Sequence, residues 1–246
     1  MSESREKQPS AGVDRRWFTT THWSIVLSAQ DRKSRQSERA LAALCETYWF
    51  PLYAYVRRSG FSSHDAQDLT QEFFVCLLDK HFLAAADREK GRFRTFLLTA
   101  VKRFLANEYD RVRAKKRGGG HRIMSLEGLE ARYCQGPADS LTPERIFEQQ
   151  WALALLDQVL ARLQAEMTAV GKAALFDAIK DHLTNSQTAG YAATAARLGM
   201  TEGAVKVAAH RLRRRYRALL REEIAQTVAN PDEIEEEICH LFACLQ

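Results

Sequence analysis

Apolar positions recur at helical spacing through almost the whole chain. In each long segment they return every three or four residues, which is the pattern of a helix with one buried face. The helical segments predicted in this way are 37–58, about 62–80, about 92–116, 143–163, about 169–183 and 191–220. The sequence shows no strand-like alternation of useful length. The predicted fold class is therefore all-α.

The segment 191–220, YAATAARLGMTEGAVKVAAHRLRRRYRALL, has the pattern of a helix-turn-helix. Gly199 tolerates the left-handed backbone that a sharp exit from the first helix needs. Thr201 is a suitable N-cap for the second helix, and Glu202 places an acid in its first turn. The small and apolar positions of the motif are filled by Ala195, Gly199, Val205 and Ala208.

Glycine-rich sequence separates two groups of predicted helices. KKRGGGHR at 115–122 ends the first group, and Thr142-Pro143-Glu144 provides an N-cap, a first-turn proline and a first-turn acid for the second. We therefore expect two helical domains joined by a flexible linker, the second containing the helix-turn-helix. The predicted division is 1–36 (N-terminal extension), 37–116 (first domain), 117–141 (linker), 142–221 (second domain) and 222–246 (acidic C-terminal helix).

Two segments lie outside these domains. The apolar stretch 17–27 is expected to form a short helix docked on the first domain. From Pro231 onward an acidic amphipathic helix follows, and three roles stay open for it: folding back on the basic helix, contacting a partner protein, or capping the last domain.

Charge changes the picture more than overall composition does. The chain has 246 residues, 46% of them apolar, and a net charge of +5. This charge is segregated: 88–122 has twelve Lys and Arg against three acids, and 197–221 has eight against one, whereas 62–79 and 222–246 contain acids and no Lys or Arg. Two contacts with nucleic acid and one with a basic protein are indicated.

Membrane and metal chemistry are not expected. Apolar runs are too short to span a bilayer and the N-terminus has no secretory signal, so a cytoplasmic location is predicted. The five cysteines are scattered and odd in number, which favours reduced, packed thiols. Cys239, His240 and Cys244 have the residue types of a metal fragment, but a second ligand pair is missing. We expect no metal and no cofactor.

Two helices carry the pattern of nucleic-acid contacts. The second helix of the helix-turn-helix is strongly cationic, which suits phosphates and guanine edges. Helix 92–116 mixes aromatic residues with cations, as single-stranded or melted DNA requires, although most of its aromatic residues must be core.

An acidic stripe is predicted on helix 62–80, where Asp65, Asp68, Glu72 and Asp79 fall within an arc of about 60°. By itself such a stripe is more often a solvated face.

The order of these parts resembles that of the bacterial RNA polymerase sigma factors. The resemblance is greatest to their small extracytoplasmic-function (ECF)-like group. The resemblance rests on SSHDAQDLTQEFFVCLL, on GRFRTFLLTAVKRFLANEYDR with its basic tail, and on the helix-turn-helix above, over about 37–116 and 149–221. It implies a protein that binds core RNA polymerase and promoter DNA and directs transcription initiation, without catalytic residues. Whether an anti-sigma protein is also a partner stays open.

The resemblance also assigns residues. The clamp of the largest polymerase subunit would be bound by Asp65, Asp68, Gln71, Glu72 and Phe74. The −10 promoter element would be bound and melted by Arg88, Lys90, Arg92, Lys102, Arg103, Asn107 and Arg111. The −35 element would be read by Lys206, Val207, His210, Arg211 and Arg214.

Two other functions compete with this interpretation. A stand-alone helix-turn-helix regulator would explain the C-terminal motif but would leave the acidic stripe and the aromatic-cationic helix without a role. A nucleic-acid enzyme would need a metal-binding carboxylate cluster; Asp65, Asp68 and Glu72 lie in one row, and no further acid obviously converges on them. The chain is therefore not expected to be an enzyme.

Overall fold

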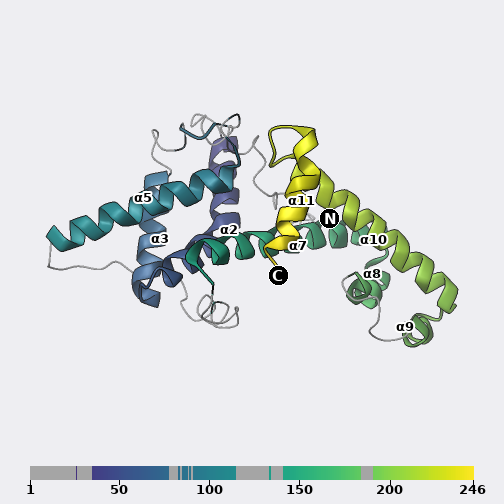
Figure 1. Cartoon of the computed structure of the whole chain (residues 1–246). Coiled ribbons are helices and arrows are strands. Elements are labelled where there is room, and N and C mark those ends of the chain that lie inside the picture. The colour runs from purple at the N-terminus through teal and green to yellow at the C-terminus, as the bar shows by residue number, and fades with distance from the viewer. Residues whose placement is uncertain are drawn as a thin grey trace, which may run out of the picture.

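The structure is a computed structural model that describes residues 26, 35–77, 83, 85–87, 89, 91–114, 133, 141–183 and 191–246. Every regular element in these residues is a helix, as the sequence predicts (Figure 1). In chain order they are α2 (Arg35–Arg58), α3 (Ser63–Leu77), α5 (Phe93–Ala114), α7 (Pro143–Ala169), α8 (Ala173–Ile179), η2 (Lys180–His182), α9 (Tyr191–Leu198), α10 (Glu202–Ala225), η3 (Pro231–Glu233) and α11 (Ile234–Ala243). None of these helices is long and apolar enough to span a bilayer.

Helices α2, α3 and α5 form the first group, and local signals set their ends. Gly60 has φ 98°, a left-handed conformation that glycine adopts at low cost, so the helix cannot continue beyond the end of α2. The Ser62 hydroxyl oxygen then accepts a hydrogen bond from the Asp65 amide at 3.1 Å and so caps α3. Aromatic rings fill the space between the helices, among them Phe73 against Phe104 with ring centroids 5.6 Å apart.

Helix α7 connects the first group to the second. Thr142 caps its start, as predicted, with its side chain accepting from the Arg145 amide at 3.3 Å. Near this end Phe147 stacks on Tyr48 of α2 at 6.4 Å. Trp151, also in this half of α7, is only 1% exposed. The first helix of the predicted second domain therefore shares a core with the first group.

The later half of α7 packs against α10 through apolar contacts and a charged network. Arg162 of α7 pairs with Glu222 at 2.6 Å and with the buried Glu223 at 2.7 Å. In a further pair the cation comes from α10 and the acid from α7: Arg215 pairs with Glu166 at 2.8 Å. Hydrogen bonding to Arg215 lowers the pKa of Glu166, so this carboxylate stays charged at neutral pH.

Helices α8, α9 and α10 form the outer part of the second group. The turn between α9 and α10 has the predicted bounds: Gly199 has φ 62°, and the Thr201 side chain accepts from the Ala204 amide at 3.2 Å. Arg213 of α10 donates to the His182 carbonyl and to the Tyr191 hydroxyl, each at 2.8 Å. These bonds attach the start of α9 and the end of η2 to α10.

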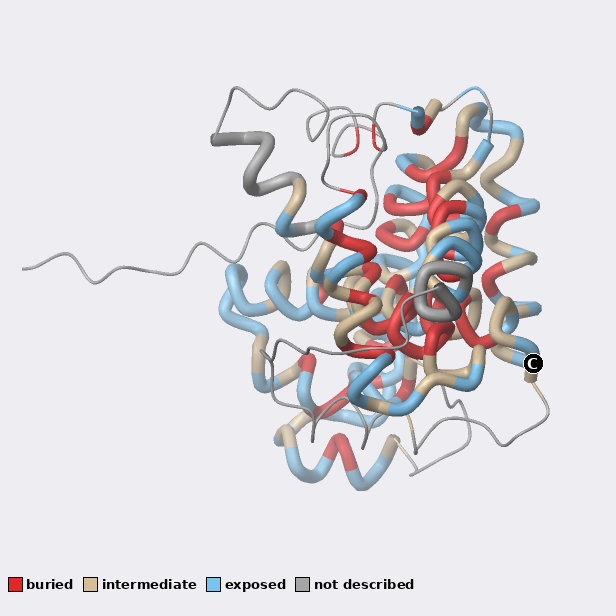
Figure 2. The backbone as a smooth tube through the Cα atoms, turned by 90° about the vertical axis from the view of Figure 1, so that its left-hand side faces the viewer, coloured by how far each residue is buried: buried red, intermediate tan, exposed pale blue. Residues whose placement is uncertain are grey.

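Helix α11 returns to the middle of the molecule and closes the junction between the two groups (Figure 1). Its Glu237 is 0% exposed and forms ion pairs with Arg94 and, at 2.8 Å, with Arg92, both at the start of α5. The Arg94 guanidinium also lies over the Trp151 ring at 4.2 Å. Figure 2 shows that buried residues line the surfaces where the helices meet.

Some expectations need correction. The cysteines were predicted to be packed thiols, but Cys76 on α3 and Cys239 on α11 are exposed. The segment predicted as one helix over about 169–183 is the end of α7, a turn with Gly171 at φ 71°, α8 and η2. Nearly all of 17–27 and of the predicted linker lies outside the described residues, so the predicted docked helix, the linker and the domain boundaries stay predictions.

The Glu237 pairs predict a specific stability difference. Glu237→Gln removes the buried charge that pairs with both Arg92 and Arg94, so we expect the free energy of unfolding to fall by about 3–5 kcal/mol. The matched variant is Glu235→Gln on the same helix, whose exposed pair with Arg221 is worth at most about 1 kcal/mol. Urea unfolding of both proteins measures the difference, and equal losses would contradict it.

Candidate nucleic-acid interface

The outer face of α10 carries several exposed cations, among them Lys206, Arg211 and Arg214. Its buried side is set by Val205, Ala209, Leu212, Leu219 and Leu220, which pack toward the other helices. The predicted −35 residues Lys206, Val207, His210, Arg211 and Arg214 are all exposed, Val207 by 51%. A hollow of about 310 Å³ on this face is lined by His210, Arg213, Arg214 and Arg217. The guanidinium groups of Arg214 and Arg217 beside the hollow suit phosphate groups.

The structure divides the cations of α10 into two sets. Arg213 and Arg215 hold neighbouring helices through the bonds described above, and hydrogen bonding to Glu166 raises the pKa of Arg215 further. Among the described residues, no acid lies within ion-pair distance of Arg211, Arg214 or Arg217. The predicted −35 residues included Arg211 and Arg214 and left out Arg213 and Arg215, in agreement with this division. Arg217 is an addition to the predicted site, since it lines the hollow.

Lys206 is exposed but already has two partners. Its ammonium group pairs with Glu202 at 2.7 Å, one helical turn away, and lies 5.7 Å from the centre of the Tyr191 ring. Hydrogen bonding to Glu202 raises the pKa of Lys206, which therefore stays positive at neutral pH.

The predicted −10 residues of α5 differ in their surroundings. Arg103 and Asn107 are exposed on α5. Lys102 pairs with Glu144 of α7 at 2.8 Å, and hydrogen bonding to this carboxylate raises the pKa of Lys102. Arg92 is held by Glu237. Arg88, Lys90 and the side chain of Arg111 lie outside the described residues.

The acidic stripe lies on the outer side of α3. Asp65 and Glu72 are exposed, and Asp68 is partly exposed with His64 at 3.3 Å; Gln71 lies beside them, partly buried. Phe74 differs from the expectation, because its ring is 4% exposed and stacks on Trp49 with centroids 5.5 Å apart. Phe74 is therefore a core residue, since the spacing of α3 turns it toward α2. Asp79 lies outside the described residues.

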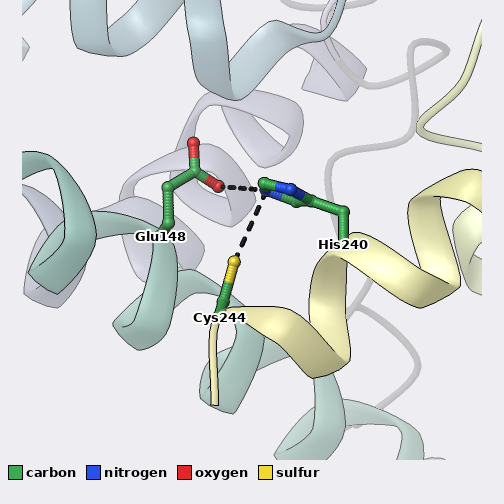
Figure 3. Close-up of side chains that lie close together, drawn as sticks. All are labelled: Glu148, His240 and Cys244. Atoms are coloured by element: carbon green, nitrogen blue, oxygen red, sulfur yellow. Dashed lines mark hydrogen bonds and ion pairs between the residues drawn. The ribbon is translucent and has the colours of Figure 1, made fainter. Parts of the chain in front are cut away.

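A third group of polar side chains lies at the junction of α7 and α11 (Figure 3). Nε2 of His240 is 3.2 Å from a carboxylate oxygen of Glu148 and 3.4 Å from the sulfur of Cys244. The same Glu148 oxygen accepts from Nε of Arg94 at 2.8 Å. The sequence indicated only the C-terminal half of this group. Glu148 comes from a helix 92 positions earlier, and no spacing rule links the two segments.

Comparison with known proteins assigns the first part of the chain. Residues 45–117, which contain most of α2 and all of α3 and α5, match the family model for sigma-70 region 2. No curated protein and no solved structure matches the chain. The match supports a factor of the sigma-70 family, and region 2 is the part of these factors that contacts core RNA polymerase.

The division of cations on α10 predicts different effects of two neighbouring arginines. Arg214→Ala should weaken binding to duplex DNA and reduce the slope of log affinity against log salt by about 1, as loss of one phosphate contact does. Arg215→Ala removes the same charge but should leave that slope unchanged, because its guanidinium is occupied by Glu166 and Glu222. Fluorescence anisotropy at several salt concentrations measures both, and an equal change in slope would contradict the division.

Proposed function

We propose that this chain is a sigma factor of the ECF-like group, which binds core RNA polymerase and directs it to promoters. The observation that carries the proposal is the match of residues 45–117 to sigma-70 region 2, together with an exposed acidic stripe on α3 inside the matched segment. The factor catalyses no reaction itself. Its specificity comes from two DNA-binding surfaces, on α5 and on α10.

The polymerase contact is assigned to Asp65, Asp68, Gln71 and Glu72. These residues lie on one side of α3, and the carboxylates of Asp65, Asp68 and Glu72 suit a basic surface on the polymerase clamp. The opposite side of α3 is occupied by Phe73, Phe74 and Leu77, which pack in the core. The stripe is therefore presented by a rigid helix, which limits the entropy lost when the partner binds.

The −35 contact is assigned to the exposed face of α10 and the −10 contact to α5. On α10 the residues are Lys206, Val207, His210, Arg211 and Arg214, to which Arg217 is added. On α5, Arg103 and Asn107 point outward, whereas Arg92 and Lys102 are paired with Glu237 and Glu144. For Arg92 or Lys102 to bind promoter DNA, phosphate must replace these carboxylates.

A pull-down of core RNA polymerase tests the proposal. The variant is Asp68→Arg/Glu72→Arg, which reverses two charges of the stripe without touching the core of α3. We expect wild type to bind and the variant to lose binding by at least tenfold, because two attractive charges become repulsive. The matched control is Asp157→Arg/Asp177→Arg, which makes the same change in net charge at exposed acids of α7 and α8. Circular dichroism checks that each variant keeps its helices.

Each other outcome has a definite meaning. If wild type fails to bind polymerase but still shifts duplex DNA, the chain is a stand-alone regulator and the polymerase assignment of α3 is wrong. If both double variants lose binding equally, overall charge and not the stripe determines the interaction.

A further inference from the structure

The group at the junction of α7 and α11 has the donor set of a metal site. A carboxylate from Glu148, an imidazole from His240 and a thiol from Cys244 are brought to within 4.8 Å of one another, measured between their ligand atoms (Figure 3). Carboxylate oxygen, imidazole nitrogen and thiolate sulfur are the three protein ligand types that Zn²⁺ uses. We propose that Glu148, His240 and Cys244 bind one Zn²⁺ ion, with a fourth position open to water.

Two of the three distances between ligand atoms match tetrahedral coordination, and the third, between the Glu148 oxygen and the Cys244 sulfur, is at most 4.8 Å. Zinc bonds of about 2.0–2.3 Å at tetrahedral angles separate neighbouring ligand atoms by about 3.3–3.6 Å. His240 Nε2 lies 3.2 Å from the Glu148 oxygen and 3.4 Å from the Cys244 sulfur. Small side-chain rotations therefore suffice to place an ion between the three atoms.

The two segments present these ligands from helices, which fixes their positions. His240 and Cys244 are one turn apart at the end of α11, so both face α7. Glu148 faces them from α7 and is hydrogen-bonded to Arg94. A carboxylate has about four lone-pair positions, so Glu148 can keep Arg94 as its orienting partner while an oxygen binds the ion.

Solvent can reach the group. The side chain of His240 is 38% exposed and that of Glu148 21%, so an ion has an entry path. A bound ion would connect α11 directly to α7, beside the buried Glu237 that holds Arg92 and Arg94. Zinc binding is therefore expected to strengthen the closure of α11 on the start of α5. This inference does not depend on the proposed sigma-factor function.

The test uses the full chain without an affinity tag, reduced and freed of metal with a chelator. Co²⁺ is titrated in as a spectroscopic probe, because a thiolate ligand gives a charge-transfer absorption and tetrahedral geometry gives intense visible bands. We expect wild type to bind one equivalent with both features and Zn²⁺ to displace it. Cys244→Ser should abolish the charge-transfer band. His240→Ala should weaken Co²⁺ binding more strongly than loss of a residue that only supports a ligand, which costs about 10- to 100-fold in metal affinity.

Matched controls come from residues of the same type outside the group. Cys239→Ser changes an exposed cysteine on the same helix, and His210→Ala changes an exposed histidine on α10; both should bind Co²⁺ like wild type. A second readout is thermal unfolding with and without Zn²⁺. The ion should raise the melting temperature of wild type and of Cys239→Ser, but not that of Cys244→Ser or Glu148→Gln.

The proposal would be overturned by several results. These are failure of wild type to take up one equivalent of Co²⁺, persistence of the charge-transfer band in Cys244→Ser, and loss of the band to the same extent in Cys239→Ser. Chelator-treated wild type and Cys244→Ser are expected to unfold at similar temperatures, which shows that the variant folds. If Cys244→Ser does not fold, Glu148→Gln decides, because wild-type Co²⁺ affinity in that variant excludes the site.

Discussion

The buried ion pairs of Glu237 are the interaction on which the arrangement of the two helix groups depends. This carboxylate is fully buried, although it lies near the end of the chain. Its partners are Arg94, in the first turn of α5, and Arg92, just before that helix. Arg94 precedes Glu237 by 143 positions. Desolvating these charges is costly, and their mutual attraction, the Glu148 pair and the Trp151 contact offset that cost. An arrangement that separated α11 from Arg92 and Arg94 would remove the ion pairs of Glu237.

This closure has consequences for the proposed function. The start of α5 belongs both to the segment that matches sigma-70 region 2 and to the junction with α11. The acidic C-terminal helix, for which the sequence left three roles open, packs on α7 and α10 and pairs with α5. Its ion pair with the basic helix is at Arg221, near the end of α10, so the hollow beside Arg214 and Arg217, nearer the start of α10, remains exposed. Closure thus engages part of the proposed −10 surface and leaves the proposed −35 surface open.

The same principle explains why similar residues on one helix have different roles. Arg213, Arg214 and Arg215 are consecutive, yet rotation of about 100° per residue turns them toward η2, toward solvent and toward α7. Arg213 and Arg215 stabilise the packing of α10, and Arg214 stays available to a ligand. Counting basic residues identified the surface, and the family resemblance selected Arg211 and Arg214 on it, whereas Arg217 was added by the structure.

Local and periodic signals in the sequence determined the helices and their ends. The apolar spacing predicted α2, α3, α5, α7 and α10, and the capping residues Thr142 and Thr201 gave the starts of α7 and α10, because these effects act within about one helical turn. The exposure of the acidic stripe and of the α10 cations followed from the same periodicity. Tertiary structure alone decided that Arg92 pairs with Glu237 and that Glu148 meets His240 and Cys244. These outcomes depend on which helix faces which, and that is set by packing between residues far apart in the chain, where no sequence spacing applies.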